Sequence, residues 1–555
     1  RALPTTTLRA TAAGEGVLRL AVAGPGGFSA TRESRITNRS SRPATTEVAT
    51  AEIAPGAERA LSFAPDRWTA GTWRAAASFG GPVRYDATGM LRMLDRYGFA
   101  CLEQSSSQLL AFAAAVLPDD AGPDDRAGRL QQAVERVLNK QRFDGSFGLW
   151  SAGGEPQYWT GAYAMEALLR ARAAGAAVPE AAIEEALKAI LEQVEEGTPD
   201  TPEERAAQAY RLHVLSLAGR PRLGAARRLM EALDELPTPL SKAQLGAAFA
   251  RAGDRPRAEA AFAAALAAPA RDWWSYDYGN TARDALAVAT LLKESGLLPD
   301  RLSALQARLP GPDFTPQGTN TQEQGWAVLT AAALGRDGRP VRVAVNGTPE
   351  PPAPRVTVAL AAPGTARNLA TDAALWSAVS VTGIPAQPAP AGRSGMQIRR
   401  RFFDLAGGPL NLDTLRQNTV FVLQLEGRAE TREAMQAVVQ QGLPAGWEIV
   451  GRLAAGEVPG MPWVGELSET VATPALDDRM AAILDLTPDR PEFRIAVRLR
   501  AVTAGRFELP GAQVEDMYRP QVFARQNTGR VTVLGPDDPL PVVTPPPAPA
   551  PGPRR

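Results

Sequence analysis

The period of the hydrophobic pattern changes twice along the 555 residues, and this change strongly constrains the fold. Near the start, Leu18, Leu20 and Val22 alternate with other residues, and glycine and proline separate short apolar runs, which is typical of strands and turns. From about residue 88 to 335 apolar residues recur at helical spacing. After residue 340 the alternation returns. The sequence therefore predicts β-structure on both sides of an all-α region.

The helical region is divided into short segments by brief breaks rich in glycine, proline and aspartate. The expected helices cover roughly residues 126–140, 158–173, 180–196, 203–218, 222–235, 240–252, 254–267, 280–295, 299–309 and 320–335. No exact sequence repeat relates them, but a long succession of antiparallel helices with short loops predicts an α/α toroid.

The second β-region has its clearest strand at 493–499, where apolar residues alternate with charged or small ones. One helix is expected within this region, near 430–441. Prolines at 385–391 predict a linker, and the proline-rich tail from 536 onward predicts disorder or polyproline II. The simplest architecture is an all-α domain inserted into one β-sandwich, followed by a second β-sandwich.

Composition excludes several classes of protein. Sixty Lys and Arg residues balance sixty Asp and Glu residues, so the chain lacks the basic footprint of a nucleic-acid-binding protein. No apolar run is long enough to span a bilayer. The chain begins at Arg1 without a signal peptide, and we expect it to be a C-terminal piece of a longer protein.

Lysine is scarce in this sequence. The lysines are Lys140, Lys188, Lys242 and Lys293. A GC-rich genome explains this scarcity, and protection of a self-acylating protein from its own amines is a second explanation.

Cys101 is the only cysteine, so no disulfide can form within the chain. It stands three residues before Gln104, at the start of an expected helix. If the Cys101 sulfur displaces ammonia from the Gln104 amide, the product is an internal thioester, which acylates amines or hydroxyls and needs no metal or cofactor. Glu103 is expected to position the helix start and not to react. The alternative is a buried cysteine that acts as a small hydrophobic residue.

The segment around the cysteine reads Tyr97-Gly98-Phe99-Ala100-Cys101-Leu102-Glu103-Gln104. It resembles the thioester motif of the alpha-2-macroglobulin family, particularly the bacterial branch, although Phe99 and Ala100 lengthen the usual Tyr-Gly-Cys order. Three later stretches, at 443–449, 477–479 and 514–520, resemble signatures of the last domain of that family. The resemblance covers nearly the whole chain.

The resemblance implies a CUB-like β-sandwich that is split by an α/α-toroid thioester domain and followed by a C-terminal macroglobulin domain. The implied boundaries are 1–86 for the first part of the CUB-like sandwich or the end of a preceding macroglobulin domain, 87–337 for the thioester domain, 338–392 for the second part of the sandwich, 393–535 for the C-terminal macroglobulin (receptor-binding-like) domain, and 536–555 for a disordered Pro-rich tail.

By the same resemblance, the protein is an endopeptidase inhibitor that traps proteases covalently, with no metal or cofactor and no catalytic residues. The implied location is the periplasm, often with a lipid anchor to the inner membrane on a part of the protein that precedes this chain. Tyr97 and Met517 are expected to cover the Cys101–Gln104 thioester. His213 is the only histidine, and it is expected to pack within a helix, because its surroundings differ from those of the histidine that directs complement relatives toward hydroxyls. Amines, and so lysines of the protease, are then the favoured targets.

Three other functions remain open. Residues 141–147 approach a repeat of triterpene cyclases, but the acidic pairs Asp119-Asp120 and Asp124-Asp125 lack the spacing of a cyclase acid. The aromatic stretch Trp273–Tyr278 suits sugar stacking, although no acid/base pair stands out beside it. A structural or adhesion module with an inactive thioester is the third. A cysteine protease is excluded, because the helical setting of His213 gives no support for a Cys–His pair.

Overall fold

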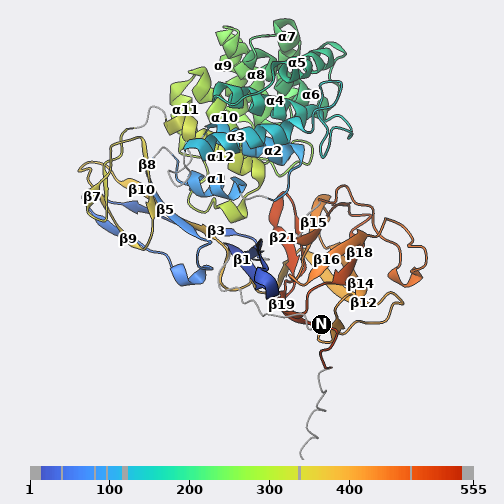
Figure 1. Cartoon of the computed structure of the whole chain (residues 1–555). Coiled ribbons are helices and arrows are strands. Elements are labelled where there is room, and N and C mark those ends of the chain that lie inside the picture. Colours follow the sequence, from blue (N-terminus) through green and yellow to red (C-terminus); the bar gives the residue numbers. More distant parts are fainter. Residues whose placement is uncertain are drawn as a thin grey trace, which may run out of the picture. The chain divides into compact units, whose positions relative to one another are not determined.

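The computed structural model describes residues 14–539, apart from 39, 41, 81–82, 96–97, 115–122, 336–338 and 475–477. The chain divides into two compact units (Figure 1). The first unit contains the residues up to Gln387 together with Tyr518–Pro520, and the second contains Pro388–Met517 and the residues from Gln521 onward.

From residue 123 to 335 the helices of the first unit begin and end close to the predicted positions, and the two helices before them had been predicted only as part of the helical region. They are α1 (Ala87–Asp95), α2 (Leu102–Ala114), α3 (Pro123–Leu138), α4 (Tyr158–Ala173), α5 (Glu180–Glu195), α6 (Pro202–Leu217), α7 (Leu223–Glu231), α8 (Pro239–Arg251), α9 (Arg255–Ala267), α10 (Thr281–Ser295), α11 (Pro299–Gln306) and α12 (Thr321–Gly335). Helix α2 contacts α4, and contacts continue from α4 to α6, α8, α10, α12 and back to α2. These alternate helices form a closed inner ring, which confirms the predicted α/α toroid.

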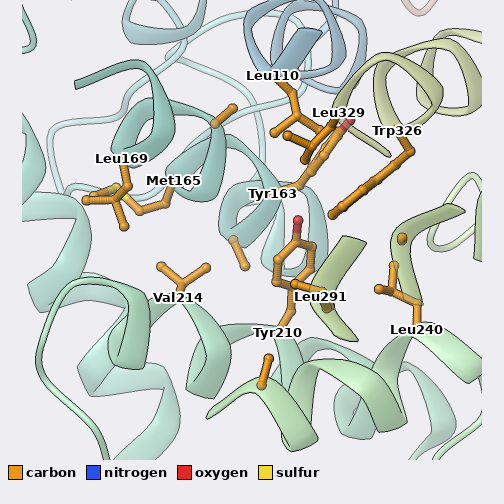
Figure 2. Close-up of a cluster of buried hydrophobic side chains, with 14 of the residues drawn as sticks. Leu110, Tyr163, Met165, Leu169, Tyr210, Val214, Leu240, Leu291, Trp326 and Leu329 are labelled. Carbon is orange, nitrogen blue, oxygen red and sulfur yellow. The ribbon is translucent and has the colours of Figure 1, made fainter. Parts of the chain in front are cut away.

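The inner ring carries the core of the toroid. Figure 2 shows Tyr163 of α4, Tyr210 of α6, Leu291 of α10 and Trp326 of α12 pointing into one cluster, and all four are almost completely buried. In α4 and α12 most residues are buried, on all faces of each helix. Burial on all faces is expected for helices surrounded by other helices.

Local sequence signals fix the ends of several of these helices. Thr201 accepts a hydrogen bond from the backbone N–H of Glu204, and Pro202 occupies the first turn of α6, so this helix begins with a capping box. Thr238 caps α8 in the same way. Gly296 ends α10 at a φ of 65°, a left-handed conformation that favours glycine.

The first unit also contains a β-sandwich. Its two sheets have the strand orders β3-β10-β5-β8 and β4-β9-β6-β7. The strands are β3 (Thr45–Ile53), β4 (Glu58–Leu61), β5 (Arg74–Gly80), β6 (Val343–Val345), β7 (Thr348–Pro349), β8 (Arg355–Leu360), β9 (Gly364–Asn368) and β10 (Leu375–Gly383). Since β3–β5 precede the helices and β6–β10 follow them, the toroid is inserted into the sandwich, as predicted. A separate hairpin is formed by β1 (Gly14–Ala23) and β2 (Ser29–Asn38).

The second unit is built from strands. They are β11 (Gly392–Ser394), β12 (Met396–Phe403), β13 (Leu415–Arg416), β14 (Val420–Ala429), β15 (Met435–Gly442), β16 (Trp447–Arg452), β17 (Arg479–Leu486), β18 (Glu492–Ala501), β19 (Gly505–Leu509), β20 (Gln513–Asp516), β21 (Arg519–Arg525) and β22 (Gly529–Leu534). Their three sheets have the orders β11-β21-β20-β15-β17, β12-β14-β18-β16 and β13-β22-β19. The predicted strand at 493–499 is confirmed as part of β18, with its apolar residues buried.

The helix predicted near 430–441 is wrong. Residues Met435–Gly442 form strand β15, which pairs with β17 on one side and β20 on the other. Its residues Met435, Ala437 and Val439 lie in the core of this unit. Pairing on both edges outweighs the moderate helix propensity of the glutamine- and alanine-containing segment.

No helix among the described residues is long and apolar enough to cross a membrane. Of the predicted Pro-rich tail, everything from residue 540 onward lies outside the described residues.

Candidate functional site

Cys101 and Gln104 exchange two hydrogen bonds at the start of α2. The backbone N–H of Cys101 donates to Gln104 Oε1, at an N···O distance of 3.1 Å. The backbone N–H of Gln104 donates to Cys101 Sγ, at an N···S distance of 3.4 Å. This pattern is a capping box in which a thiol replaces the usual serine or threonine hydroxyl. The helix start therefore folds the carboxamide and the thiol over the same turn.

The thiol is completely removed from solvent, and Gln104 is almost as deeply buried. Burial raises the pKa of the Cys101 thiol to about 12, and the nearby Glu103 carboxylate raises it further. The backbone N–H of Gln104, the Tyr518 hydroxyl and the Lys140 ammonium act in the opposite direction. At neutral pH the unmodified thiol is therefore protonated, and a thiolate at this position needs help from its surroundings.

Glu103 joins three helices of the inner ring. Ser107 Oγ donates to Glu103 Oε1 at 2.7 Å, and Thr321 Oγ1, at the start of α12, lies 2.9 Å from Glu103 Oε2. The Ser107 hydroxyl also lies 2.9 Å from the Tyr163 hydroxyl of α4. Burial raises the pKa of the Glu103 carboxyl to about 7, although the two hydroxyl donors lower it. These contacts hold the Glu103 carboxyl between α2 and α12, and its expected role at the helix start stays a prediction.

An aromatic cluster lies against the thiol. The Tyr518 hydroxyl is 3.8 Å from Cys101 Sγ, and Tyr518 groups with the first unit. The Tyr518 ring centroid lies 4.6 Å from that of Tyr278 and 5.9 Å from that of Trp273. The guanidinium carbon of Arg519 lies over the Trp273 ring, 5.0 Å from its centroid. Burial raises the pKa of the Tyr518 hydroxyl well above its ordinary value, so the ring covers the sulfur as a neutral group.

The contact with Cys101 through Tyr518 was not predicted from the sequence. The expected residue was the preceding one, Met517, which is buried and whose backbone N–H donates to Gln436 O within the second unit. The only signal in the sequence was a second large side chain in the segment 514–520. Tyr97, the other residue expected to cover the thioester, lies outside the described residues.

Buried ion pairs hold the segment that carries Trp273 and Tyr278. Arg283 is completely buried in α10 and forms ion pairs with Asp277 and with Asp284, the second at 2.8 Å. Arg271 lies 2.7 Å from a carboxylate oxygen of each of the same two aspartates. Two arginines therefore neutralise two buried carboxylates at the base of this segment.

The same contacts bear on the alternative functions. The aromatic rings that suited sugar stacking face Tyr518, and Asp277 is held between two arginines, an arrangement unlike that of a glycosidase acid. The aspartates considered for a cyclase lie in the part of the chain whose side chains are not described.

His213 lies in α6, within the core of the toroid. It is completely buried, and its Nε2 atom is 3.5 Å from Glu166 Oε1. The Tyr210 hydroxyl donates to the other oxygen of Glu166 at 2.6 Å. Burial opposes ionisation of Glu166, but the Arg170 guanidinium and His213 hold the pKa of this carboxyl well below its usual range. These are packing and pairing contacts between α4 and α6, as expected for a helix histidine.

Among the described residues, no group of three or more His, Cys, Asp and Glu side chains is arranged to hold a metal ion.

A family model and the most similar relatives point to the same family. Residues 395–521 match the family model of the bacterial alpha-2-macroglobulin MG10 domain. The alpha-2-macroglobulin of Escherichia coli K12 is 28% identical over 473 residues, covering 78% of this chain and 28% of the relative. That of Xylella fastidiosa strain Temecula1 is 28% identical over 509 residues, covering 82% of this chain and 30% of the relative. The chain thus spans less than a third of the length of these relatives.

Solved structures show the same relationship. Native E. coli alpha-2-macroglobulin from domain MG7 to the C-terminus aligns with a TM-score of 0.79 at 25% identity, covering 94% of this chain and 88% of the other. Salmonella alpha-2-macroglobulin reacted with methylamine aligns with a TM-score of 0.81 at 26% identity, covering 94% of this chain and 36% of the other. The predicted fold class is confirmed by these alignments.

Proposed function

The chain belongs to the bacterial alpha-2-macroglobulin family, and on that basis we propose that it is the thioester-bearing portion of a covalent protease trap. In this proposal it is an endopeptidase inhibitor that reacts once, not a turnover enzyme. The observation that carries the proposal is the reciprocal pair of hydrogen bonds between buried Cys101 and Gln104.

Thioester formation follows from this geometry. The Cys101 sulfur attacks the side-chain carbonyl carbon of Gln104, a C–S bond forms, and the C–N bond breaks to release ammonia. The thiol proton leaves with the nitrogen, so atoms and charge balance. During the attack, negative charge develops on Gln104 Oε1, which already accepts the backbone N–H of Cys101. The capping box holds both reactants in one turn, which favours an intramolecular reaction.

Acyl transfer to an amine converts the thioester back into an amide. The amine of a captured protein attacks the acyl carbon of residue 104, an amide bond forms, and the C–S bond breaks. The proton lost by the amine ends on the Cys101 sulfur. The reaction requires that water stays away until the trap is triggered, and the rings of Tyr518, Tyr278 and Trp273 supply apolar cover on the described side of the thiol.

Amines are the proposed targets, and hydroxyls are not. His213 pairs with Glu166 inside the toroid core and is completely buried there. A histidine engaged in this way is unsuited to accept the acyl group and pass it to a hydroxyl. The preference for lysines of the attacking protease follows from this packing.

The activity of the whole protein belongs to the same proposal. Cleavage of a bait segment outside this chain would expose the thioester, and the protease would be captured as it cuts. Periplasmic location and an inner-membrane lipid anchor on a preceding part of the protein are proposed on the family resemblance. The Salmonella relative described above as reacted with methylamine supports the amine chemistry for this family.

The proposal is tested by incubating the chain with a biotin-labelled primary amine and mapping the label by peptide mass spectrometry. We expect the label on residue 104, with the Cys101 thiol freed in proportion. Cys101→Ser is the matched control and should take up no label. Equal labelling of the Cys101→Ser variant, or labelling away from residue 104, would reject the proposal.

A further inference from the structure

Lys140 is a buried cation beside the proposed thioester. It follows α3, and its side chain is only slightly exposed. Its Nζ atom donates to Ser105 Oγ at 3.2 Å and to the backbone oxygen of Arg136 at 2.7 Å. Ser105 stands four residues after Cys101, so the two side chains lie over one another on the same face of the first turn of α2. The ammonium is therefore anchored on the side of the helix that carries the thiol.

The backbone around Lys140 is also tied to the start of α2. The N–H of Gly148 donates to the Lys140 carbonyl oxygen at 3.0 Å, and the N–H of Leu102 donates to the Leu149 carbonyl oxygen at 2.7 Å. The segment that begins with Lys140 therefore lies alongside the residue that follows Cys101. This arrangement fixes the position of the ammonium relative to the reacting turn.

The hydrogen-bond partners of this ammonium are a neutral hydroxyl and a neutral carbonyl. A buried cation is costly unless a negative charge compensates it. A thiolate at Cys101 is such a charge, and it exists only while the thioester forms or opens. The buried Lys140 ammonium can therefore compensate the negative charge that appears on the Cys101 sulfur during the reaction.

The electrostatic coupling between the two groups runs in both directions. Burial lowers the pKa of Lys140, while the charge of Cys101 raises it and the Arg136 guanidinium lowers it. For Cys101, burial and Glu103 raise the pKa, and Lys140 lowers it together with the backbone N–H of Gln104 and the Tyr518 hydroxyl. Among these groups Lys140 is the cation that favours the thiolate.

We propose that the Lys140 ammonium, held by Ser105, stabilises the Cys101 thiolate as it leaves the acyl carbon, and so acts as a positioning charge for the transfer step. The inference rests on the proposed thioester. The electron pair of the broken C–S bond goes to sulfur, and the proton given up by the attacking amine neutralises it afterwards. Lys140 begins and ends the step as an ammonium, so it neither gains nor loses a bond.

The test compares Lys140→Met, Lys140→Arg and Lys242→Met with the unchanged chain. Lys242 is the matched control, because it is also a buried lysine whose ammonium donates to a backbone oxygen, that of Leu233. Two quantities are measured: the rate at which methylamine releases the thiol, and the pH dependence of alkylation of Cys101 after release. The pH dependence of alkylation reports the pKa of the Cys101 thiol, which would not change if Lys140 had only a structural role.

We expect Lys140→Met to raise the thiol pKa by about one unit and to slow thiol release roughly three- to tenfold. Lys140→Arg should restore most of both, and Lys242→Met should change neither. If Lys140→Met has the thiol pKa and release rate of the unchanged chain, the inference is overturned. Failure of Lys140→Arg to restore the pKa would overturn it as well, because the effect would then follow shape and not charge.

The two proposals fail in different ways. A thiol that titrates before methylamine in an unchanged chain that still carries glutamine at position 104 rejects the thioester itself. A different result is a chain that is lighter by one ammonia and yet shows a free thiol from the outset. The acyl carbon of residue 104 would then be bonded to an amine of the chain such as Lys140, and the electrostatic role of Lys140 would be overturned. If Lys140→Met does not fold, Ser105→Ala replaces it, because loss of the hydroxyl that holds the ammonium should shift the thiol pKa in the same direction; an unchanged pKa in Ser105→Ala would overturn the inference.

Discussion

The carboxamide oxygen of Gln104 accepts the backbone N–H of Cys101, while the Cys101 sulfur accepts the backbone N–H of Gln104. The two side chains that would form the thioester are therefore also the two side chains that cap α2. The spacing of three residues suits both roles, because a capping box joins the residue before a helix to its third residue. The spacing within a single helical turn is enough to bring the nucleophile and the electrophile close together.

The capping role of the thiol can be separated from its chemistry by two substitutions that both remove the thioester. Cys101→Ser keeps a side-chain acceptor for the N–H of Gln104, whereas Cys101→Ala removes it. We expect Cys101→Ala to be less stable than Cys101→Ser by about 1 kcal/mol in urea unfolding. Equal stability of the two variants would mean that the sulfur does not cap the helix.

Removal of the ring of Tyr518 should expose the thioester. Its hydroxyl lies 3.8 Å from Cys101 Sγ, and its ring packs against Tyr278 and Trp273. We expect Tyr518→Ala to react with methylamine faster, and to lose its thioester to water on storage, because apolar cover is lost. Tyr518→Phe keeps the ring and should behave almost like the unchanged chain. A Tyr518→Ala variant with unaltered methylamine kinetics would show that other residues supply the cover.

The raised pKa of Glu103 predicts a pH dependence of stability. In the folded chain this pKa is about 7, against an ordinary value of 4.5, so folding favours the protonated carboxyl. The resulting stabilisation is fully present below pH 4.5 and is lost as the pH rises through about 7. The loss amounts to about 3 kcal/mol.

Glu103→Gln removes this titration and should flatten the curve of unfolding free energy between those pH values. Glu195→Gln, at an exposed position of α5, is the control and should leave the curve unchanged. If the Glu103→Gln curve follows that of the unchanged chain, the carboxyl is ionised in the folded state over the whole range.

The buried ion pairs behind the aromatic cluster should be important for both stability and cover. Among the residues that the structure describes, Arg283→Met leaves Asp277 and Asp284 paired with Arg271 alone. We expect a loss of about 3–5 kcal/mol in unfolding free energy, because buried carboxylates lose a partner. Faster methylamine cleavage should accompany it, since the segment bearing Trp273 and Tyr278 is loosened.

Arg257→Met provides the comparison for Arg283→Met. The exposed Arg257 side chain pairs with the partly buried Asp254 at the start of α9, and loss of this surface pair should cost less than about 1 kcal/mol. Similar losses in the two variants, or unchanged methylamine kinetics in Arg283→Met, would contradict the role given to the buried cluster.

Much of the fold could be predicted because the deciding information is local. The helix expected at 203–218 is α6, Pro202–Leu217, since its cap and first-turn proline are written in consecutive residues. The strand at 493–499 was visible from its alternation. By contrast β15 was mistaken for a helix, because its conformation depends on β17 and β20, its partners across the sheet.

The candidate site divides in the same way. Cys101 and Gln104 could be found because their chemistry depends on a spacing of three residues. Tyr518 could not, because 417 residues separate it from the sulfur that it contacts. The position of Lys140 beside Ser105 was equally hidden, since nothing in the local sequence says which face of α2 its ammonium meets.

The most direct test of the central claim is titration of the single thiol in the native chain before and after methylamine, with intact mass measured on the same samples. A live thioester predicts no thiol before treatment, one thiol per chain afterwards, and a starting mass lower by one ammonia than the sequence requires. A thiol that titrates from the outset in a chain that still carries glutamine at position 104 would contradict the account. Glutamate at that position would instead record a thioester that had formed and been hydrolysed.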